Sequence, residues 1–140
     1  MKPLVETENS LVLRTDFSDD AAWRAVCSAV QAPQGPLEFR ANLDFVSDRE
    51  YEEATFAQLV TSATEIADRA FIFVVDRTAV THIEHPVAVL DVSIEPGRSF
   101  RVVPSAMWSV ENNLSIGNMD FEEFAGAVDA DGVFRGFPES

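Results

Sequence analysis

The feature that most constrains the fold is an uninterrupted apolar run, residues 70–75, in the middle of the chain. A short apolar run of this kind, bounded by charged residues, predicts a strand that is buried on both faces. Such a strand needs other elements packed above and below it. The run therefore favours a layered domain in which helices cover a central sheet on each side.

Strand and helix patterns alternate along the first half of the chain. Residues 11–13 predict a second buried strand, and the alternation of apolar and polar side chains over residues 39–45 is typical of a half-exposed strand at a sheet edge. The order strand, helix, strand, helix, strand predicts right-handed crossovers and a parallel sheet core. The two helices are predicted from apolar stripes spaced three and four residues apart, namely Trp23, Val26, Cys27 and Val30, and Phe56, Leu59, Val60 and Ala63.

The second half of the chain predicts a hairpin followed by helices. Residues 87–94 and 100–103 flank a Pro-Gly pair that is typical of a type II turn. A helix is predicted to begin at Pro104. Two capping-box patterns mark further helix starts, Thr55 with Gln58 and Asp120 with Glu123.

These patterns together predict an α/β fold. We expect a single three-layer domain at residues 10–140, with a mixed, mostly parallel sheet flanked by helices and a helical C-terminal third. Residues 1–9 are polar and predict a flexible N-terminal tail.

The chain is strongly acidic, with ten basic and twenty-four acidic residues and a net charge of −14. Proteins bind phosphate backbones by neutralising them with Lys and Arg. The balance therefore argues against nucleic acid and against an anionic membrane as partners. The charge is explained either by solubility alone or by a basic protein partner that the electrostatic field attracts.

Cys27 is the single cysteine, so no internal disulfide is expected and a reducing, cytoplasmic compartment is predicted. The first ten residues lack the basic flank and apolar stretch of a signal peptide. The sequence has no glycine-rich phosphate loop, CxxC pair or GxSxG motif. We expect no cofactor, and the sequence leaves open whether the protein is an enzyme.

Three segments are similar to a known family. They are LVLRTDFSDDAAW at residues 11–23, DRTAVTHIEHP at residues 76–86, and EPGRSFRVVPSAMWSVENNLSIGNMDFEEFAGAVDADGVFRGF at residues 95–137. Together they resemble a family of small actinobacterial proteins catalogued as a domain of unknown function, over about residues 11–137. The resemblance implies a bacterial cytoplasmic protein. It implies no activity, so it assigns no functional residue.

Carboxylates follow two of the predicted parallel strands. Asp16 comes just after the first strand and Asp76 just after residues 70–75, and parallel α/β sheets bind ligands at the carboxyl ends of their strands. Carboxylates gathered there can bind Mg²⁺, but Ser18 stands where a DxD pair would have its second Asp. The alternative is that these residues cap helices and form a solvated rim. We favour that alternative and assign no metal.

Basic and imidazole side chains form two further candidate sites. Arg14 and Arg77 lie beside the same strand ends, where they could hold an anion by paired hydrogen bonds or form ion pairs with the surrounding acids. His82 and His85, with Glu84 between them, have a spacing that could share a metal. They fall in a predicted loop, where ordinary hydrogen-bonded or exposed histidines are the commoner alternative.

Polar side chains also gather near a predicted helix end. Trp108, Glu111, Asn112 and Asn113 lie within six residues, although Asn disfavours helix interiors. They form either a polar pocket or interface anchor, or a Trp packed on the core with amides that cap the helix break at Gly117.

Two functions remain open, and we favour the first because charge and size are observed whereas a pocket is conjectured. The first is a non-enzymatic acidic interaction protein, of the inhibitor or immunity type, that binds a basic partner near Asp16, Asp44, Asp48 or residues 52–53. The second is a small enzyme or ligand-binding protein of a specialised bacterial pathway, with a pocket near residues 108–118. Both are compatible with a monomer and with a homodimer formed through the predicted edge strand.

Overall fold

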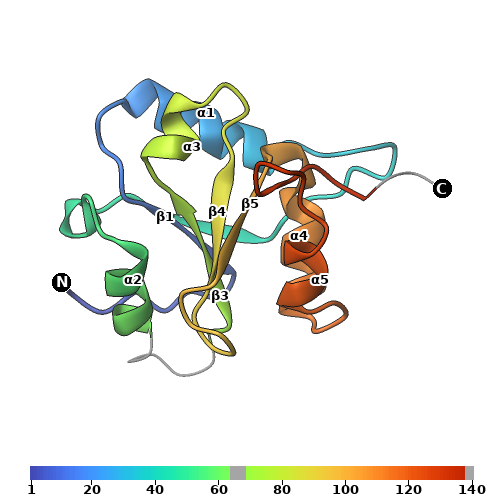
Figure 1. Ribbon diagram of the computed structural model, residues 1–140. Helices are drawn as coiled ribbons and strands as arrows, with labels where there is room; N and C mark the ends of the chain where they lie inside the picture. Colours follow the sequence, from blue (N-terminus) through green and yellow to red (C-terminus); the bar gives the residue numbers. More distant parts are fainter. Residues whose placement is uncertain (64–68, 138–140) are drawn as a thin grey trace.

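The computed structural model describes residues 1–63 and 69–137 and contains one mixed sheet with helices on both faces (Figure 1). The strands are β1 (Ser10–Arg14), β2 (Leu43–Val46), β3 (Phe71–Val75), β4 (Val87–Asp91), β5 (Ser99–Val102) and β6 (Val133–Phe134). The helices are α1 (Asp20–Gln31), α2 (Phe56–Ala63), α3 (Arg77–Thr81), α4 (Met107–Ser115) and α5 (Phe121–Ala125), with 3-10 turns η1 (Arg49–Tyr51) and η2 (Pro104–Ala106).

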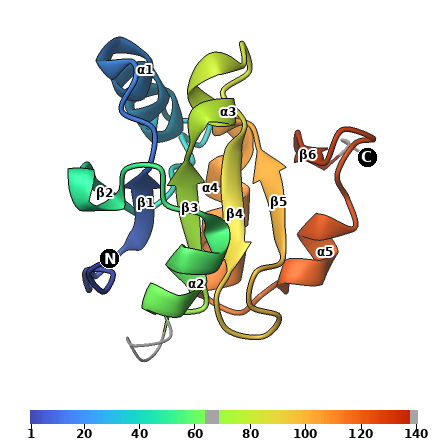
Figure 2. The same ribbon diagram turned by 60° about the vertical axis from the view of Figure 1, so that its left-hand side comes forward.

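The six strands follow the order β2-β1-β3-β4-β5-β6 (Figure 2). β1 pairs in parallel with both β2 and β3, and β5 pairs in parallel with β6, whereas β3–β4 and β4–β5 are antiparallel. The sheet is mixed as predicted, but parallel and antiparallel pairing are nearly balanced rather than mostly parallel. The cause is the link from β3 to β4, which contains only the five-residue α3 and is too short for the crossover that a parallel return needs.

The central strand β3 is buried on both faces, as its apolar run predicts. Phe73 and Val75 belong to a cluster that includes residues of α1, α3, α4 and α5. Ile72 and Val74 belong to a second cluster, which packs against α2 and η1. The alternation of side chains along one strand therefore separates the two cores of a three-layer domain.

Residues 1–9 form no helix or strand, yet the beginning of this predicted tail contacts the domain. Leu4 is 2% exposed and belongs to the second core cluster. The hydroxyl of Tyr51 donates a hydrogen bond of 2.7 Å to the carbonyl of Pro3. Lys2 forms an ion pair with Asp48. These contacts bring the chain that precedes β1 along the α2 side of the sheet.

Local signals in the sequence are confirmed at several turns and caps. Both capping boxes are present, at Thr55 with Gln58 and at Asp120 with Glu123. Gly97 adopts a φ of 98° between Pro96 and Arg98, as the second central residue of a type II turn requires. The amide of Arg98 closes this turn by donating to the carbonyl of Glu95 at 3.0 Å.

The strand predicted at residues 39–45 lies at a sheet edge, but its start was predicted too early. β2 begins at Leu43, because Phe39 instead pairs with Gln34 across a tight turn. Glu38 adopts a φ of 54° in that turn. The predicted helical C-terminal third is not confirmed, because this part of the chain contains the short α4 and α5 together with β6, separated by turns. Within the described residues, no helix is long and apolar enough to cross a membrane.

Candidate functional site

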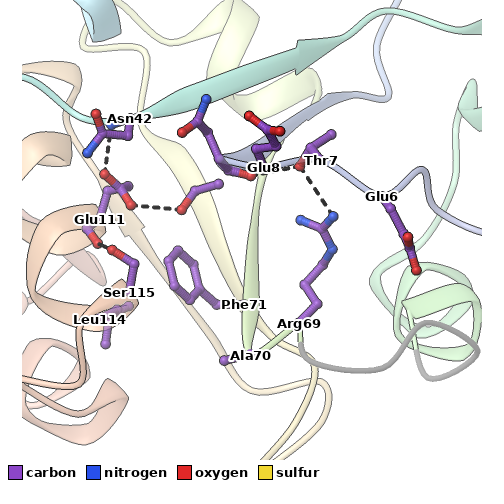
Figure 3. Close-up of a pocket in the computed structure, with 12 residues that line it drawn as sticks. Glu6, Thr7, Glu8, Asn42, Arg69, Ala70, Phe71, Glu111, Leu114 and Ser115 are labelled. Carbon is purple, nitrogen blue, oxygen red and sulfur yellow. Dashed lines mark hydrogen bonds between the residues drawn. The ribbon is translucent and has the colours of Figure 1, made fainter.

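A cavity of about 550 Å³ opens at the end of the sheet where β1, β2 and β3 begin (Figure 3). Ser10 and Asn42 line it from the starts of β1 and β2, and Phe71 lines it from the start of β3. Four charged side chains also line it, namely Arg69, which precedes β3, Glu111 of α4, and Glu6 and Glu8 from the chain before β1. Cavities of this volume are typical of small-molecule sites, although the wall here is mainly polar.

Glu111 is a buried carboxylate on the wall of this cavity, with 2% of its surface exposed. Its Oε1 accepts hydrogen bonds from the backbone N–H of Asn42 at 2.7 Å and from Nδ2 of Asn112 at 3.3 Å. Its Oε2 accepts a bond of 2.9 Å from the hydroxyl of Ser10. These donors suit an ionised carboxylate, but all of them are neutral. In the described part of the chain, no cation forms an ion pair with Glu111.

Arg69 is the cation among these four charged residues, and hydrogen bonds to described residues engage its Nη2 but not its Nε. Its Nη2 donates to the carbonyl of Val5 at 3.0 Å and to the hydroxyl of Thr7 at 3.3 Å. Its Nε is buried and has no hydrogen-bond acceptor among the described residues. Burial lowers the pKa of the Arg69 guanidinium from its usual value, against the nearby charges of Glu6 and Asp44, which raise it.

Phe71 separates Arg69 from Glu111. In Figure 3, Arg69 and Glu111 lie on opposite sides of the cavity with the Phe71 ring between them. The ring is 8% exposed and meets Phe73 edge-to-face at a centroid distance of 5.5 Å, which anchors it to the core. From Arg69 to Glu111 the cavity wall therefore presents a guanidinium, an apolar surface and a carboxylate, with Glu6 and Glu8 as two further carboxylates on the wall.

A family model described as a domain of unknown function, DUF6924, matches residues 9–137. The chain belongs to the DUF6924 family. The match spans all strands from β1 to β6 and includes Ser10, Asn42, Arg69, Phe71 and Glu111 of the cavity. No curated protein matches the chain. The resemblance to an uncharacterised family is thereby confirmed, and membership in DUF6924 assigns no activity.

In this DUF6924 domain, the two aspartates at the strand ends serve as helix and turn partners. Asp16 accepts hydrogen bonds from the backbone and hydroxyl of Ser18. Burial raises the pKa of the Asp16 carboxyl, but these bonds together with the charges of Arg77 and Arg14 leave the pKa lowered. Asp76 caps α3 through the N–H of Ala79 and forms two hydrogen bonds with Arg101, at 2.9 and 2.7 Å. The structure thus occupies Asp16 and Asp76 with local contacts.

The two arginines proposed for an anion site have different surroundings. Arg14 is 4% exposed, pairs with Asp20 at 2.7 Å and lies over the rings of Phe17 and Trp23, at 4.3 and 5.4 Å from the centroids. Arg77 is exposed on α3 and forms no ion pair with any described residue. Arg14 is thus engaged by protein groups, and neither residue lines the cavity described above.

The two histidines each contact protein groups. His85 Nδ1 lies 2.8 Å from the carbonyl of Ala79, and His82 Nδ1 accepts the N–H of Glu84 at 3.1 Å. The carboxylate of Glu84 is bound by Arg135 at 2.8 and 2.9 Å. Within residues 1–63 and 69–137, no group of three or more His, Cys, Asp or Glu side chains is arranged to hold a metal ion.

Of the four residues singled out near the helix end, two belong to the cavity and two to the packing of α4. Glu111 lines the cavity, and Asn112 donates hydrogen bonds to the Glu111 carboxylate and to the carbonyl of Arg40, the latter at 3.0 Å. Trp108 stacks on Phe39 at a centroid distance of 4.4 Å. Asn113 bonds to the carbonyl of Ser109 and to the side chain of Asn118, so it stabilises the end of α4.

Sequence reasoning found Glu111 but missed Arg69, Ser10 and Asn42. The signal for Arg69 was present, since it is a charged residue placed directly before a strand that is buried on both faces. Ser10 and Asn42 carry no comparable signal. Their role depends on α4, which is about 100 and 70 residues further along the chain.

Proposed function

We propose that the protein binds a small molecule carrying a carboxylate or another compact anion, in the cavity at the starts of β1 and β3. Arg69 is the anchor. The observation that carries the proposal is the buried Nε of Arg69, which faces no acceptor among the described residues while the side chain lines the cavity. A buried polar group without a partner costs free energy, so a bound anion would stabilise the guanidinium.

The other arginines support this interpretation by contrast. Five of them form ion pairs with carboxylates, namely Arg14, Arg49, Arg98, Arg101 and Arg135.

Three more arginines, Arg24, Arg40 and Arg77, form no ion pair in the described parts of the chain, but they are exposed to water. Among the described arginines, Arg69 alone is both half-buried and without an ion pair to a described carboxylate. In a chain with a net charge of −14, carboxylates are abundant. A half-buried guanidinium that forms no ion pair with the described residues is therefore best explained by a partner that comes from outside.

Titration with hexanoate tests this function, with ¹⁵N NMR of the Arg69 Nε–H resonance as the readout. We expect the resonance to shift in a saturable way, because the carboxylate would accept the free N–H. Arg69→Gln should abolish the heat of binding in calorimetry. Arg24→Gln removes an exposed, unpaired arginine on α1 and should leave it unchanged. No shift with either hexanoate or succinate at millimolar concentration would contradict the proposal.

A second function is supported by a different observation. The N–H of Glu53 donates to the carbonyl of Thr15 at 2.8 Å, which brings Glu52 and Glu53 close to Asp16 at the carboxyl end of β1. Asp48 follows the neighbouring strand β2. We infer, as the alternative, that this acidic end binds a basic protein in the manner of an inhibitor or immunity protein.

Affinity capture from native lysate at low salt tests the alternative. We expect one stoichiometric basic protein to be captured by the wild type and by Glu38→Lys, a charge reversal in the α1–β2 loop. The double variant Glu52→Lys/Glu53→Lys should lose it, because like charges would then meet. Recovery of no stoichiometric basic protein would count against this alternative.

We also propose a cytoplasmic location in an actinobacterium, supported by the resemblance of residues 11–137 and by the single cysteine. Localisation of a tagged copy by cell fractionation checks it. Among the described residues, β2 has a strand neighbour on one side only, and we propose a homodimer through this edge as the alternative to a monomer. Light scattering separates a mass of 15.4 kDa from twice that value.

A further inference from the structure

Resting on the proposed function, we propose that the ligand is a linear amino acid whose two charges lie at opposite ends. Its carboxylate binds Arg69, its ammonium group binds Glu111, and its apolar middle lies against Phe71. The juxtaposition behind the proposal is the opposed pair Arg69 and Glu111 on the two sides of one cavity.

The negative charge of Glu111 has no cationic partner among the described residues, which favours a cationic group on the ligand. A carboxylate offers about four lone-pair positions, and the three donors from Ser10, Asn42 and Asn112 fill three. Neutral donors orient a buried carboxylate but do not cancel its charge, and an uncompensated buried charge is costly. An ammonium group can supply both the missing hydrogen bond and the missing charge.

The surroundings of Arg69 call for an anion by the same reasoning. Nη2 makes both of its hydrogen bonds, to Val5 and Thr7, whereas Nε and Nη1 have no acceptor in the described part of the chain. A carboxylate can accept from more than one N–H of a guanidinium. Thr7 and the Arg69 head group therefore form one end of the site.

The length of the ligand is argued from the segment between Thr7 and Ser10, which connects the Arg69 end of the cavity with the Glu111 end. Thr7 contacts Arg69 and Ser10 contacts Glu111. Three residues span at most about 10 Å, which limits how far apart Thr7 and Ser10 can lie along the backbone, and the Phe71 ring lies between the two charged groups and keeps them apart. The two charges of an α-amino acid sit on adjacent carbons, so a chain of several methylene groups fits this separation better, and Phe71 provides an apolar surface for it.

A matched series of probes tests the proposal by calorimetry on the full-length protein. The series comprises 4-aminobutanoate, 5-aminopentanoate and 6-aminohexanoate, each compared with the acid that lacks the amine and with its N-acetyl derivative. We expect the best amino acid of the series to bind at least about tenfold tighter than both of its analogues. Glu111→Gln should remove this advantage and leave the binding of the plain acid intact.

Circular dichroism and urea unfolding establish whether Glu111→Gln is folded. If it is not, the comparison of the three probe types on the wild type decides alone. If a plain acid binds as tightly as the amino acid of the same length, the proposal of an amino-acid ligand is wrong, whereas the proposed anion site at Arg69 is retained. Failure of every plain acid and amino acid to bind would overturn both.

Discussion

Replacement of Phe124 by Ala tests whether α5 belongs to the hydrophobic core. Phe124 is fully buried, and its ring packs against Phe100, Phe134 and Phe137 at centroid distances of 6.3, 5.2 and 5.6 Å. Truncating a buried Phe to Ala costs about 3–5 kcal/mol of unfolding free energy. Each aromatic contact adds roughly 0.5–1.5 kcal/mol, so we expect a loss toward the upper end of that range.

Urea unfolding followed by tryptophan fluorescence measures this loss. Domains have a total stability of about 5–15 kcal/mol, so Phe124→Ala should shift the midpoint strongly or prevent folding at room temperature. Phe137→Ala is the control, because Phe137 is 46% exposed and should lose only about 1–2 kcal/mol. A loss below about 1 kcal/mol for Phe124→Ala would refute the packing of α5 against the sheet.

Three further predictions concern single groups. Burial raises the pKa of the Cys27 thiol to about 11 from 9.0, so iodoacetamide at pH 8 should alkylate the native protein about a hundredfold more slowly than the urea-unfolded chain; equal rates would contradict this. Asp120→Ala removes a capping box and should cost about 1 kcal/mol in urea unfolding, whereas an unchanged midpoint would argue against the cap. Hydrogen bonds from Arg135 hold the pKa values of Glu84 and Asp131 in the folded protein below their usual values of 4.5 and 3.8. The two ionised carboxylates therefore stabilise the folded state above those usual values, and this stabilisation is lost as the pH falls through the lowered pKa values. On acidification from pH 7 to about pH 3, the unfolding free energy of Arg135→Gln should therefore fall by less than that of the wild type. An equal fall in both proteins would contradict the predicted pH dependence.

Sequence patterns predicted the parts of the fold that depend on neighbours along the chain. The apolar run before Asp76 is the strand β3, and the capping boxes at Thr55 and Asp120 begin helices as expected. Burial of a strand on two faces and the capping of a helix are visible within a few residues. The balance of parallel and antiparallel pairs was not, because it depends on how far the link between β3 and β4 can reach.

The candidate site shows the same division. Glu111 attracted attention because an acid and two amides stood together in a predicted helix. At the carboxyl ends of the strands, helix capping was favoured over a ligand site for Asp16 and Asp76, and their side chains are engaged by Ser18, Ala79 and Arg101. The cavity lies at the opposite end of β1 and β3.

Read alone, the amino-acid order predicts the buried strands, the two longest amphipathic helices and a large negative charge, since these depend on periodicity and composition. It does not settle that Arg69 and Glu111 share one cavity. Those residues are 42 positions apart, and Ser10 is 101 positions from the carboxylate it orients. Such contacts form only once the strand order is established and α4 packs against the sheet. Packing between distant segments depends on side-chain shape and burial, which local sequence patterns do not predict.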